Sequence, residues 1–589
     1  MLSSFGRVGG TGHQTRRIRA RALPVAAAGL SLCLIHLFAG QNSGRPSAPF
    51  LDGNAESGLS IFVLRSGTPE KKYIMETMSA GLCLFDYDND GLVDIYLVNG
   101  GTVEDFRRGT PSSLRNALFQ NLGQRRFKNV TAEAGIGGNG YWGMGCSVAD
   151  YDNDGWLDLY VTNYGSNVLY HNLGKGRFED ATRAAGADDV RWSTGSSWAD
   201  FDKDGDLDLF VANYIELDRN NLPEPGSPDY GIMGSTTMGC QYMGFPVSCG
   251  PRGLPGAGDS LFVNQGDGTF REQSKAFGMD DPSGHYGLGA VWSDLDDDGY
   301  PDLYVANDTD INLLYHNRRD GTFEEIGLLS GAGVRETGAE QAGMGLAVGD
   351  FLNQGSLSIL VTNFADDYCT LYRNEGKLNF TDVTETADLA RPTLPFVSWG
   401  TFFFDYDNDG WLDLFVANGH VFPEADRIQN RMIERYRQRS LLFRNLGTGR
   451  FIESAESAGI TPVRIGRGAA FADLDNDGGL DVVVNNLDES PSLFWNTPGA
   501  ERKFLSLKLV GARSNRAAVG TRVRLRTADV WQTREVISGG SYLSQSDLRL
   551  HFGLGAAAQA DEIVIRWPSG QTSRMSAVSA NQFLTIREK

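Results

Sequence analysis

The stretch "DYDNDGWLDLYVTNY", residues 150–164, places four carboxylates, those of Asp150, Asp152, Asp154 and Asp158, within nine positions. Carboxylates this close repel one another: at about 4 Å and an effective dielectric constant near 20, each pair costs about 4 kcal/mol. Carboxylates at alternating positions, with a glycine that allows a sharp turn, can instead wrap their oxygens around a hard cation. The stretch therefore predicts a calcium-binding loop, because Ca²⁺ offsets the repulsion.

The same nine-residue pattern occurs seven times along the chain. Every copy keeps glycine at its sixth position, and asparagine always follows thirteen residues after the first aspartate. The copy "DFLNQGSLS" at Asp350 has Leu352, Gln354 and Ser358 where the other copies have aspartate. A solvated acidic turn would explain one complete copy but hardly six. We therefore expect about six structural Ca²⁺ sites and no metal beside Asp350.

The predicted ligands of each site are four aspartate side chains and the carbonyl oxygen at position seven. An EF-hand is excluded because it needs glutamate at position twelve, where the six complete copies have leucine or valine. The expected metal ligands are Asp86, Asp88, Asp90, Leu92 and Asp94; Asp150, Asp152, Asp154, Trp156 and Asp158; Asp200, Asp202, Asp204, Asp206 and Asp208; Asp294, Asp296, Asp298, Tyr300 and Asp302; Asp405, Asp407, Asp409, Trp411 and Asp413; and Asp473, Asp475, Asp477, Gly479 and Asp481.

Strand-like sequence surrounds every loop. The stretches before and after it, such as "MGCSVAD" and "DLYVTN", are β-rich, and a second unit, Leu-Phe/Tyr-x-Asn, follows each loop. All but the last of these second units lead through a turn to phenylalanine and a short acidic tail. Each repeat thus contains four strands, and seven repeats predict an all-β fold, a seven-bladed β-propeller with the metal loops between strands one and two of each blade.

The seventh repeat lacks its fourth strand, and the N-terminal part of the chain supplies a candidate. "FLDGNAESGL", residues 50–59, matches "FIESAESAGI", residues 451–460, in its Phe, Ala-Glu-Ser and Gly positions. We expect residues 50–59 to close the ring by pairing with the strand near residues 492–496. The alternative is an unstructured linker after the leader.

The repeats and the C-terminal motifs resemble known families. Residues 50–500 resemble the FG-GAP units of integrin α-subunit propellers, which implies that the aspartate loops bind Ca²⁺. Residues 503–588 resemble the ASPIC/UnbV domain, a small β-rich domain, through "SNRAAVGTRVRL", "GGSYLSQSDLRLHFGLG" and "IRWPSGQ". The combination is similar to cartilage-acidic-protein-like extracellular proteins, a resemblance that implies architecture and calcium but no defined activity.

The first forty residues are typical of a leader. Five arginines and no acidic residue precede the apolar run "ALPVAAAGLSLCLIHLFAG". We interpret residues 1–40 as an export signal, with an uncleaved N-terminal anchor as the alternative and the only expected membrane contact. The protein is then exported, to the extracellular space, cell surface or periplasm. The net charge of −21 argues against a nucleic-acid partner.

Three repeats carry long insertions between strands two and three, on the face opposite the metal loops. In repeat three, Cys240 and Cys249 are expected to form a disulfide in an exported chain. The remaining cysteines after the leader, Cys83, Cys146 and Cys369, lie on expected strands and are interpreted as buried thiols. The repeat-six insertion, "PEADRIQNRMIERYRQR", predicts a basic helix. By resemblance to integrins, this face is the ligand-facing side.

No set of residues indicates catalysis. His171 and His316 occupy the same repeat position, which indicates packing, and His551 is interpreted as structural. We therefore predict no enzyme activity, no catalytic residues and no organic cofactor, but an interaction or adhesion scaffold that binds an unknown extracellular protein or carbohydrate. The alternative is an extracellular glycan-acting enzyme with its active site in the propeller channel.

Overall fold

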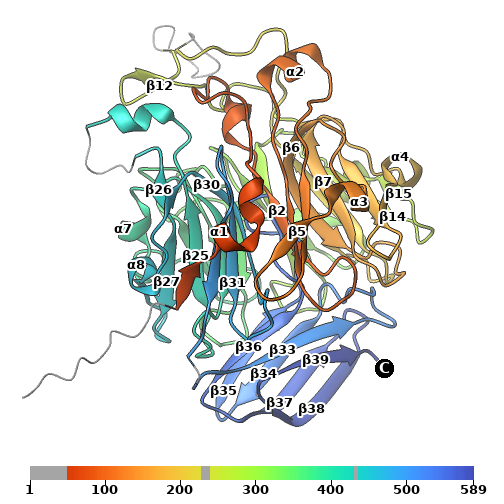
Figure 1. Cartoon of the computed structure of the whole chain (residues 1–589). Helices are drawn as coiled ribbons and strands as arrows, with labels where there is room; N and C mark the ends of the chain where they lie inside the picture. Colours follow the sequence, from red (N-terminus) through yellow and green to blue (C-terminus); the bar gives the residue numbers. More distant parts are fainter. Residues whose placement is uncertain (1–48, 227–238, 430–434, 500) are drawn as a thin grey trace, which may run out of the picture. The chain divides into compact units, whose positions relative to one another are not determined.

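The computed structural model describes residues 49–226, 239–429, 435–499 and 501–589. Within these residues seven four-stranded antiparallel sheets form the blades of a propeller (Figure 1). Blade 1 consists of β2 (Leu82–Phe85), β3 (Asp94–Leu97), β4 (Ala117–Asn121) and β5 (Phe127–Asn129). Blade 2 consists of β6 (Trp142–Ala149), β7 (Asp158–Tyr164), β8 (Val168–Asn172) and β9 (Phe178–Asp180). Blade 3 consists of β10 (Ser193–Ala199), β11 (Asp208–Asn213), β14 (Ser260–Asn264) and β15 (Phe270–Glu272).

The other four blades repeat this order. They consist of β16 (Gly287–Ser293), β17 (Asp302–Asn307), β18 (Leu313–Asn317) and β19 (Phe323–Glu325); β20 (Leu346–Gly349), β21 (Ser358–Val361), β22 (Thr370–Asn374) and β23 (Phe380–Asp382); β24 (Ser398–Phe404), β25 (Asp413–Asn418), β27 (Leu441–Asn445) and β28 (Phe451–Glu453); and β30 (Gly466–Ala472), β31 (Asp481–Asn486), β32 (Ser492–Asn496) and β1 (Phe50–Asp52). The fold class predicted from the sequence is confirmed.

The first strands of the blades form a closed inner ring. Contacts run from β2 through β6, β10, β16, β20, β24 and β30, and β30 returns to β2. Apolar side chains fill the space between neighbouring blades; Tyr96, Val148 and Leu159, for example, belong to one buried cluster between blades 1 and 2. The hydrophobic core is therefore distributed around the ring.

The predicted ring closure is confirmed for β1. Phe50, Leu51 and Asp52 pair with Asn496, Trp495 and Phe494 of β32 in antiparallel register. The pairing ends at Asp52, because the chain then forms the single-turn helix α1 (Asn54–Ser57) and the 3₁₀ helix η1 (Leu59–Ile61). Blade 6 has the same turn, α8 (Ala455–Ala458), after its outer strand, so the matching letters "AES" mark a helix rather than a strand.

The same helical turn follows the outer strand in most other blades. It is α3 (Thr131–Ala134) in blade 1, α4 (Thr182–Ala185) in blade 2, α5 (Ser274–Phe277) in blade 3 and α6 (Gly327–Ser330) in blade 4. In blade 5 the short helix α7 (Ala390–Thr393) comes later.

The C-terminal part of the chain forms two further sheets. One contains β36 (Leu550–Gly555), β33 (Lys503–Val510) and β39 (Gln582–Arg587), and the other contains β35 (Val530–Glu535), β34 (Arg522–Thr527), β37 (Gln559–Arg566) and β38 (Thr572–Ser579). Figure 1 shows these strands (blue) at one end of the ring and the insertions of blades 1 and 3, with α2 and β12, at the other end.

The segment between β35 and β36 enters the centre of the propeller. We call residues 538–545 the plug segment. Ser541 exchanges two backbone hydrogen bonds with Leu346 of blade 5, at 2.7 and 2.8 Å, and Gln545 donates to Leu82 of blade 1 at 2.9 Å. Further hydrogen bonds reach four more blades, through Cys146, Ser197, Thr401 and Ala469. The channel is thus filled from this end.

A second segment closes the channel from the other end. The 3₁₀ helix η2 (Ile74–Thr77) is buried along its whole length. Met75, Trp399 and Tyr542 belong to one apolar cluster that joins η2, the inner strands and the plug segment. Arg467 is fully buried there, and its guanidinium donates to the carbonyl oxygens of Thr77 and Gly419 at 2.7 and 2.9 Å.

Two disulfides are present among the described residues. The Cys240–Cys249 disulfide is present, as the spacing predicts. Its cysteines flank the small hairpin of β12 (Gln241–Tyr242) and β13 (Phe245–Pro246). Cys83 and Cys146 also form a disulfide, so their interpretation as thiols was wrong. They lie on β2 and β6, first strands of neighbouring blades, and their Cα atoms are 6.1 Å apart. Cys369 is a buried free thiol.

Where they are described, the insertions form little regular structure. The blade 1 insertion contains α2 (Val103–Arg108). In blade 6 the predicted helix is wrong where the chain is described: residues 423–427 form the 3₁₀ helix η3 (Pro423–Arg427), and β26 (Gln438–Arg439) pairs with β29 (Val463–Arg464). Residues 430–434 lie outside the described residues, as does the leader. In the described part of the chain, no helix has the length and apolar character needed to cross a membrane.

Candidate metal centres

Each aspartate loop connects the first two strands of a blade. In blade 2, β6 ends at Ala149 and β7 begins at Asp158, so the loop occupies the intervening turn. Asn153 has a φ of 60° and Gly155 a φ of 97°, left-handed conformations that asparagine and glycine accept most readily. The sixth position is glycine in every copy for this reason.

The loops bring the acids at positions one, three and five together. Ligand atoms lie within 4.8 Å of one another in the groups Asp86–Asp88–Asp90, Asp150–Asp152–Asp154, Asp200–Asp202–Asp204 and Asp294–Asp296–Asp298. The acid at position five also accepts the backbone N–H of position seven, as Asp154 does from Trp156 at 2.8 Å. The turn is therefore held before any cation binds.

The acid at position nine lies behind this group. Asp158 is 1% exposed and accepts the backbone N–H groups of Asn172 and Tyr151 at 2.7 and 3.2 Å. The side chain of Asn172 in turn donates to the carbonyl oxygens of Leu157, in its own blade, and Tyr87, in blade 1, at 3.0 and 2.9 Å. The recurrent asparagine of the second unit thus fastens each loop to the loop of the preceding blade.

Buried carboxylate oxygens without a hydrogen-bond donor distinguish the complete loops. They are Asp86 Oδ1, Asp88 Oδ1, Asp150 Oδ1, Asp200 Oδ1, Asp407 Oδ1 and Asp475 Oδ1. In blade 4, Asp298 Oδ2 also has no hydrogen bond, although the Arg319 guanidinium lies beside it. In blade 5, by contrast, Asp350 accepts the N–H groups of Gln354 and Gly355 at 2.9 and 2.7 Å through its two oxygens. Because an unpaired buried acceptor is costly, these oxygens fit a bound hard cation.

The first aspartate of several loops has a raised pKa. Burial, reinforced by the neighbouring carboxylates, raises the pKa of Asp150 and Asp405 to about 8. Burial also raises the pKa of Asp200 and Asp473 to about 7. At neutral pH these loops would retain protons unless a cation replaced them, so cation binding and proton release are coupled.

Arginines pair with the acids of two complete loops. In blade 7, Arg125 Nε lies 2.7 Å from Asp475 Oδ2, and in blade 4 two arginines do so. Arg319 Nε lies 2.8 Å from Asp298 Oδ2, and Arg566 of the C-terminal domain pairs with Asp294. These guanidinium groups neutralise part of the loop's charge. Any cation in blade 4 competes with them.

Two histidines contact carboxylates of the loops, so their role is not packing alone. His171 Nδ1 lies 3.3 Å from Asp158 Oδ1, and His316 Nδ1 lies 3.0 Å from Asp302 Oδ1. The Asp158 carboxylate beside it raises the pKa of His171 to about 9. The sequence showed their shared position but not that the position faces the ninth residue of the loop. His551 is buried, and its Nε2 lies 2.6 Å from Asn408 Oδ1.

The C-terminal domain contacts the metal loops directly. Arg516 N donates to Asn153 Oδ1 at 2.7 Å, Arg522 pairs with Asp297 at 2.7 Å, and Arg549 donates to Asn476 Oδ1 at 3.0 Å. Asn153, Asp297, Asn408 and Asn476 all occupy position four of their loops. The sequence analysis did not predict this contact. The polar residue at position four of every copy was the sequence feature that could have indicated it.

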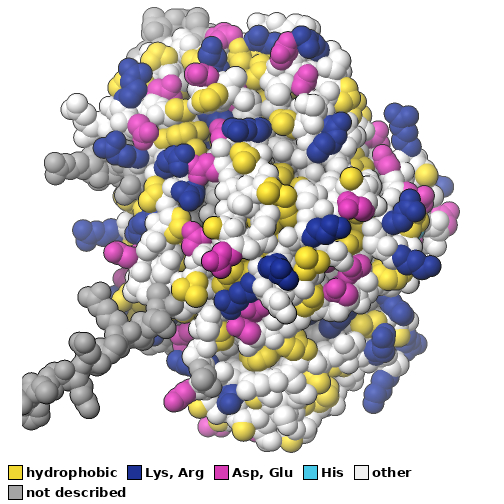
Figure 2. Space-filling model, viewed as in Figure 1, with side chains coloured by type: hydrophobic (Ala, Val, Ile, Leu, Met, Phe, Trp, Pro, Cys, Tyr) yellow, Lys and Arg dark blue, Asp and Glu magenta, His cyan; other side chains and the backbone are white. Residues whose placement is uncertain are grey.

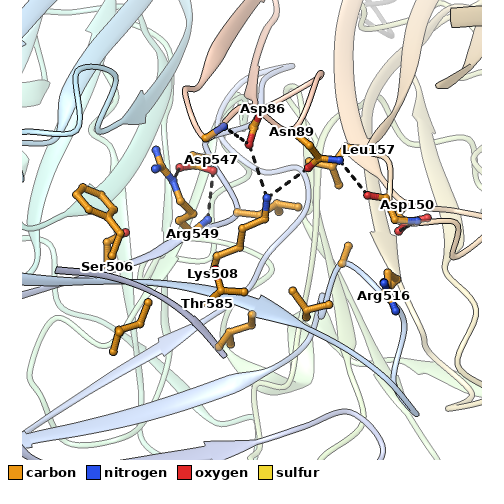
Figure 3. A pocket seen from close by; sticks show the side chains of 18 of the residues that line it. Asp86, Asn89, Asp150, Leu157, Ser506, Lys508, Arg516, Asp547, Arg549 and Thr585 are labelled. Atoms are coloured by element: carbon orange, nitrogen blue, oxygen red, sulfur yellow. Dashed lines mark hydrogen bonds and ion pairs between the residues drawn. The ribbon is translucent and has the colours of Figure 1, made fainter. Parts of the chain in front are cut away.

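A cleft remains between the loops of blades 1, 2 and 7 and the C-terminal sheet. Its volume is about 660 Å³. Figure 3 shows Lys508 extending from the C-terminal sheet between Asp86 and Asn89, with Asp547 and Arg549 to one side. Lys508 Nζ lies 3.6 Å from Asp86 Oδ2. Elsewhere, on the face seen in Figure 2, basic and acidic side chains are interspersed.

Family models match both parts of the chain. The FG-GAP-like repeat matches residues 86–161, 150–211, 294–361 and 350–416, and the ASPIC and UnbV model matches residues 511–589. These matches confirm the resemblance drawn from the motifs.

The curated relatives are cartilage acidic proteins. The chain is 29% identical over 279 residues to cartilage acidic protein 1 of Homo sapiens, covering 46% of this chain and 39% of the relative. It is 28% identical over 287 residues to that of Mus musculus, covering 47% and 41%. The chain thus spans about two fifths of the length of these relatives.

One solved structure with a similar fold is the BP39L lectin from Burkholderia pseudomallei. It is 8% identical, has a TM-score of 0.43, and the match covers 72% of this chain and 99% of the lectin. A likeness at this level carries no argument about function.

Proposed function

Because the chain carries FG-GAP-like repeats followed by an ASPIC/UnbV domain, we propose that it is an exported, calcium-binding interaction scaffold. Its similarity to proteins named cartilage acidic protein supports a role in contacts outside the cell. Its two disulfides support an oxidising compartment, because such bonds persist mainly outside the cytoplasm. The partner is a protein or a carbohydrate.

The observation that carries the calcium proposal is the contrast between complete and incomplete loops. Each complete loop keeps at least one buried carboxylate oxygen without a hydrogen bond, such as Asp150 Oδ1 or Asp407 Oδ1, whereas Asp350, the single carboxylate of the blade 5 loop, uses both of its oxygens. A chain of ordinary acidic turns would have no reason to differ in this way. We propose six structural Ca²⁺ sites, with blade 4 the weakest because Arg319 and Arg566 already neutralise it.

The filled channel favours a scaffold over the alternative enzyme. Propeller enzymes use residues around an open channel, but here the plug segment and η2 occupy it. Tyr542, Leu543 and Gln545 are each at most 2% exposed. A glycan chain could reach inner-strand residues only if the C-terminal domain left the ring.

Calorimetric titration of the full chain with Ca²⁺ tests the proposal. We expect about six equivalents to bind with dissociation constants of about 10⁻⁴–10⁻³ M, the range of extracellular modules. Asp150→Asn should remove one equivalent, whereas the matched Asp350→Asn should remove none. Absence of binding, or equal losses in the two variants, would contradict the calcium proposal.

A further inference from the structure

The cleft beneath the metal loops has a regular floor. β33 and β39 are parallel neighbours, and Ser506, Lys508 and Val510 pair with Phe583, Thr585 and Arg587. Because alternate residues of a strand share a face, these six side chains lie on one face of the sheet, and all line the cleft. The opposite face, with Leu505 and Leu507, belongs to the hydrophobic core.

The roof of the cleft is formed by the candidate metal centres. Asp86, Asp90 and Asp150, from the loops of blades 1 and 2, line it. A loop offers four carboxylates and one carbonyl oxygen, whereas Ca²⁺ takes about 6–8 oxygen ligands. Where the carboxylates bind through one oxygen each, a cation there would have one or more coordination positions for oxygens from outside the loop.

We propose that this cleft binds an acidic saccharide, whose carboxylates and hydroxyls bridge the loop Ca²⁺ and the basic floor. This inference rests on the proposed calcium function and names its ligand class and site. It places the ligand at the C-terminal side of the ring, not at the insertion-bearing face that the integrin resemblance implies.

The charges of the cleft favour an anionic ligand once Ca²⁺ is present. Arg516 and Arg587 are exposed, and Lys508 has two long contacts, with Asp86 at 3.6 Å and with Asn89 Oδ1 at 3.4 Å. Asp547 is already neutralised by Arg549. Two bound Ca²⁺ ions would then neutralise the carboxylates of the roof. The positive charges of Lys508, Arg516 and Arg587 would remain available to the ligand.

The uncharged groups of the cleft favour a saccharide over an acidic peptide. Phe583 lies edge-on to Phe504 and is still 40% exposed, so it offers an apolar ring to a sugar. Thr585 adds a hydroxyl beside Lys508. This combination of an aromatic ring, hydroxyls and cations suits a ligand that carries hydroxyl groups on every unit.

The test uses the full chain in millimolar Ca²⁺ with hexagalacturonate as the probe, measured by calorimetry. We expect binding that Lys508→Gln and Arg587→Gln each weaken about tenfold, equivalent to about 1.4 kcal/mol. Arg574→Gln is the matched control, because Arg574 is an exposed arginine that pairs with Glu562 on the other sheet. Among the described residues Arg587 forms no hydrogen bond or ion pair with a loop, so its variant separates ligand binding from any change in calcium affinity.

Neutral galactohexaose and hexa-aspartate complete the experiment. Galactohexaose should not bind measurably. The proposal would be overturned if Lys508→Gln and Arg587→Gln bound hexagalacturonate as tightly as the control Arg574→Gln. Tighter binding of hexa-aspartate than of hexagalacturonate would also overturn it. If Ca²⁺ binds to the chain but hexagalacturonate does not, the cleft inference alone fails. If Ca²⁺ does not bind at all, the proposed function fails with it.

Discussion

The hydroxyl of Tyr542 donates a hydrogen bond to the carbonyl oxygen of Met78 over 2.6 Å. This bond joins the plug segment, which enters the channel from the C-terminal domain, to the segment that closes the channel from the other end. Two pieces of chain more than four hundred residues apart in sequence thus meet inside the ring. The C-terminal domain is part of the propeller's core rather than an appendage.

Truncating Tyr542 should therefore destabilise the whole chain. Tyr542→Phe removes one buried hydrogen bond and should cost about 1 kcal/mol. Tyr542→Ala also leaves a cavity against Trp399 and should cost about 3–5 kcal/mol. Denaturant unfolding measures both, with Tyr141→Phe, at an exposed tyrosine, as the control. Equal stability of Tyr542→Ala and wild type would contradict a filled channel.

Ring closure is tested by two neighbouring residues of β1. Phe50 is 2% exposed and Leu51 is 53% exposed. Phe50→Ala should lower the free energy of unfolding by about 3–5 kcal/mol, and Leu51→Ala by less than about 0.5 kcal/mol. Deleting residues 49–52 should uncover the edge of β32 and cause aggregation, seen by light scattering. Unchanged melting and solubility of the deletion would exclude this closure.

Chelation should destabilise the ring if the loops bind Ca²⁺. At ten times its dissociation constant, each site would add about 1.4 kcal/mol, so six sites give about 8 kcal/mol as an upper estimate. The melting temperature should fall steeply in a chelator, and proteolysis should begin at the aspartate loops. Asp152→Ala should reproduce part of this loss. Identical melting with and without chelator would mean that the loops are only acidic turns.

The Cys83–Cys146 disulfide should contribute strongly to stability. Its cysteines are separated by 63 residues, and closing a loop of that length is worth about 4 kcal/mol in the chain-entropy account. The double variant Cys83→Ala/Cys146→Ala should melt several degrees lower than wild type. Reductant should no longer lower its melting temperature by breaking this bond. Peptide mapping of the unreduced protein that found two free thiols would refute the bond.

Glu588 should make stability depend on acid pH. Burial would raise its pKa, but hydrogen bonds, first from Ser514 N–H and the Ser569 hydroxyl, outweigh that effect and lower the pKa from 4.5 to about 2. A carboxylate with a lowered pKa stabilises the fold above its unfolded pKa, and this contribution is lost as the pH falls through the folded pKa.

A pKa of about 2 in place of 4.5 corresponds to about 3 kcal/mol at neutral pH, an upper bound because solvent screens the charge. Glu588→Gln should therefore unfold more easily than wild type near pH 6, and the difference should shrink as the pH approaches about 2. Denaturant unfolding at a series of pH values measures it. A difference that stayed constant with pH would show that the charge of Glu588 has no role.

The sequence was most informative where the repeats gave several copies of one signal. The spacing of Asp150 and its equivalents predicted the loops, and the letters shared by residues 50 and 451 predicted the pairing of Phe50 with Asn496. The helical turn at residues 54–57 was missed because a match between two segments does not state which structure they share.

Contacts between distant elements could not be read from the repeats. The disulfide between Cys83 and Cys146 required knowing that both lie on inner strands of adjacent blades, at facing positions. The insertion of Tyr542 into the channel depends on how two domains pack, for which the motif "GGSYLSQ" gives no local signal. The unpartnered oxygen of Asp150, which separates it from Asp350, is a feature of three-dimensional packing alone.

The asparagine that ends the third strand of each blade has a consequence for the ring as a whole. Asn172 reaches back to Tyr87, Asn264 to Tyr151, and the same step continues around the ring until Asn121 reaches Leu474. The seven loops therefore form a circular array with nearest-neighbour coupling, and every coupling runs in the same direction. Loosening one loop weakens the support of the next, so loss of structure spreads blade by blade from its starting point. A calcium titration followed by a structural signal should rise more steeply than independent sites would allow.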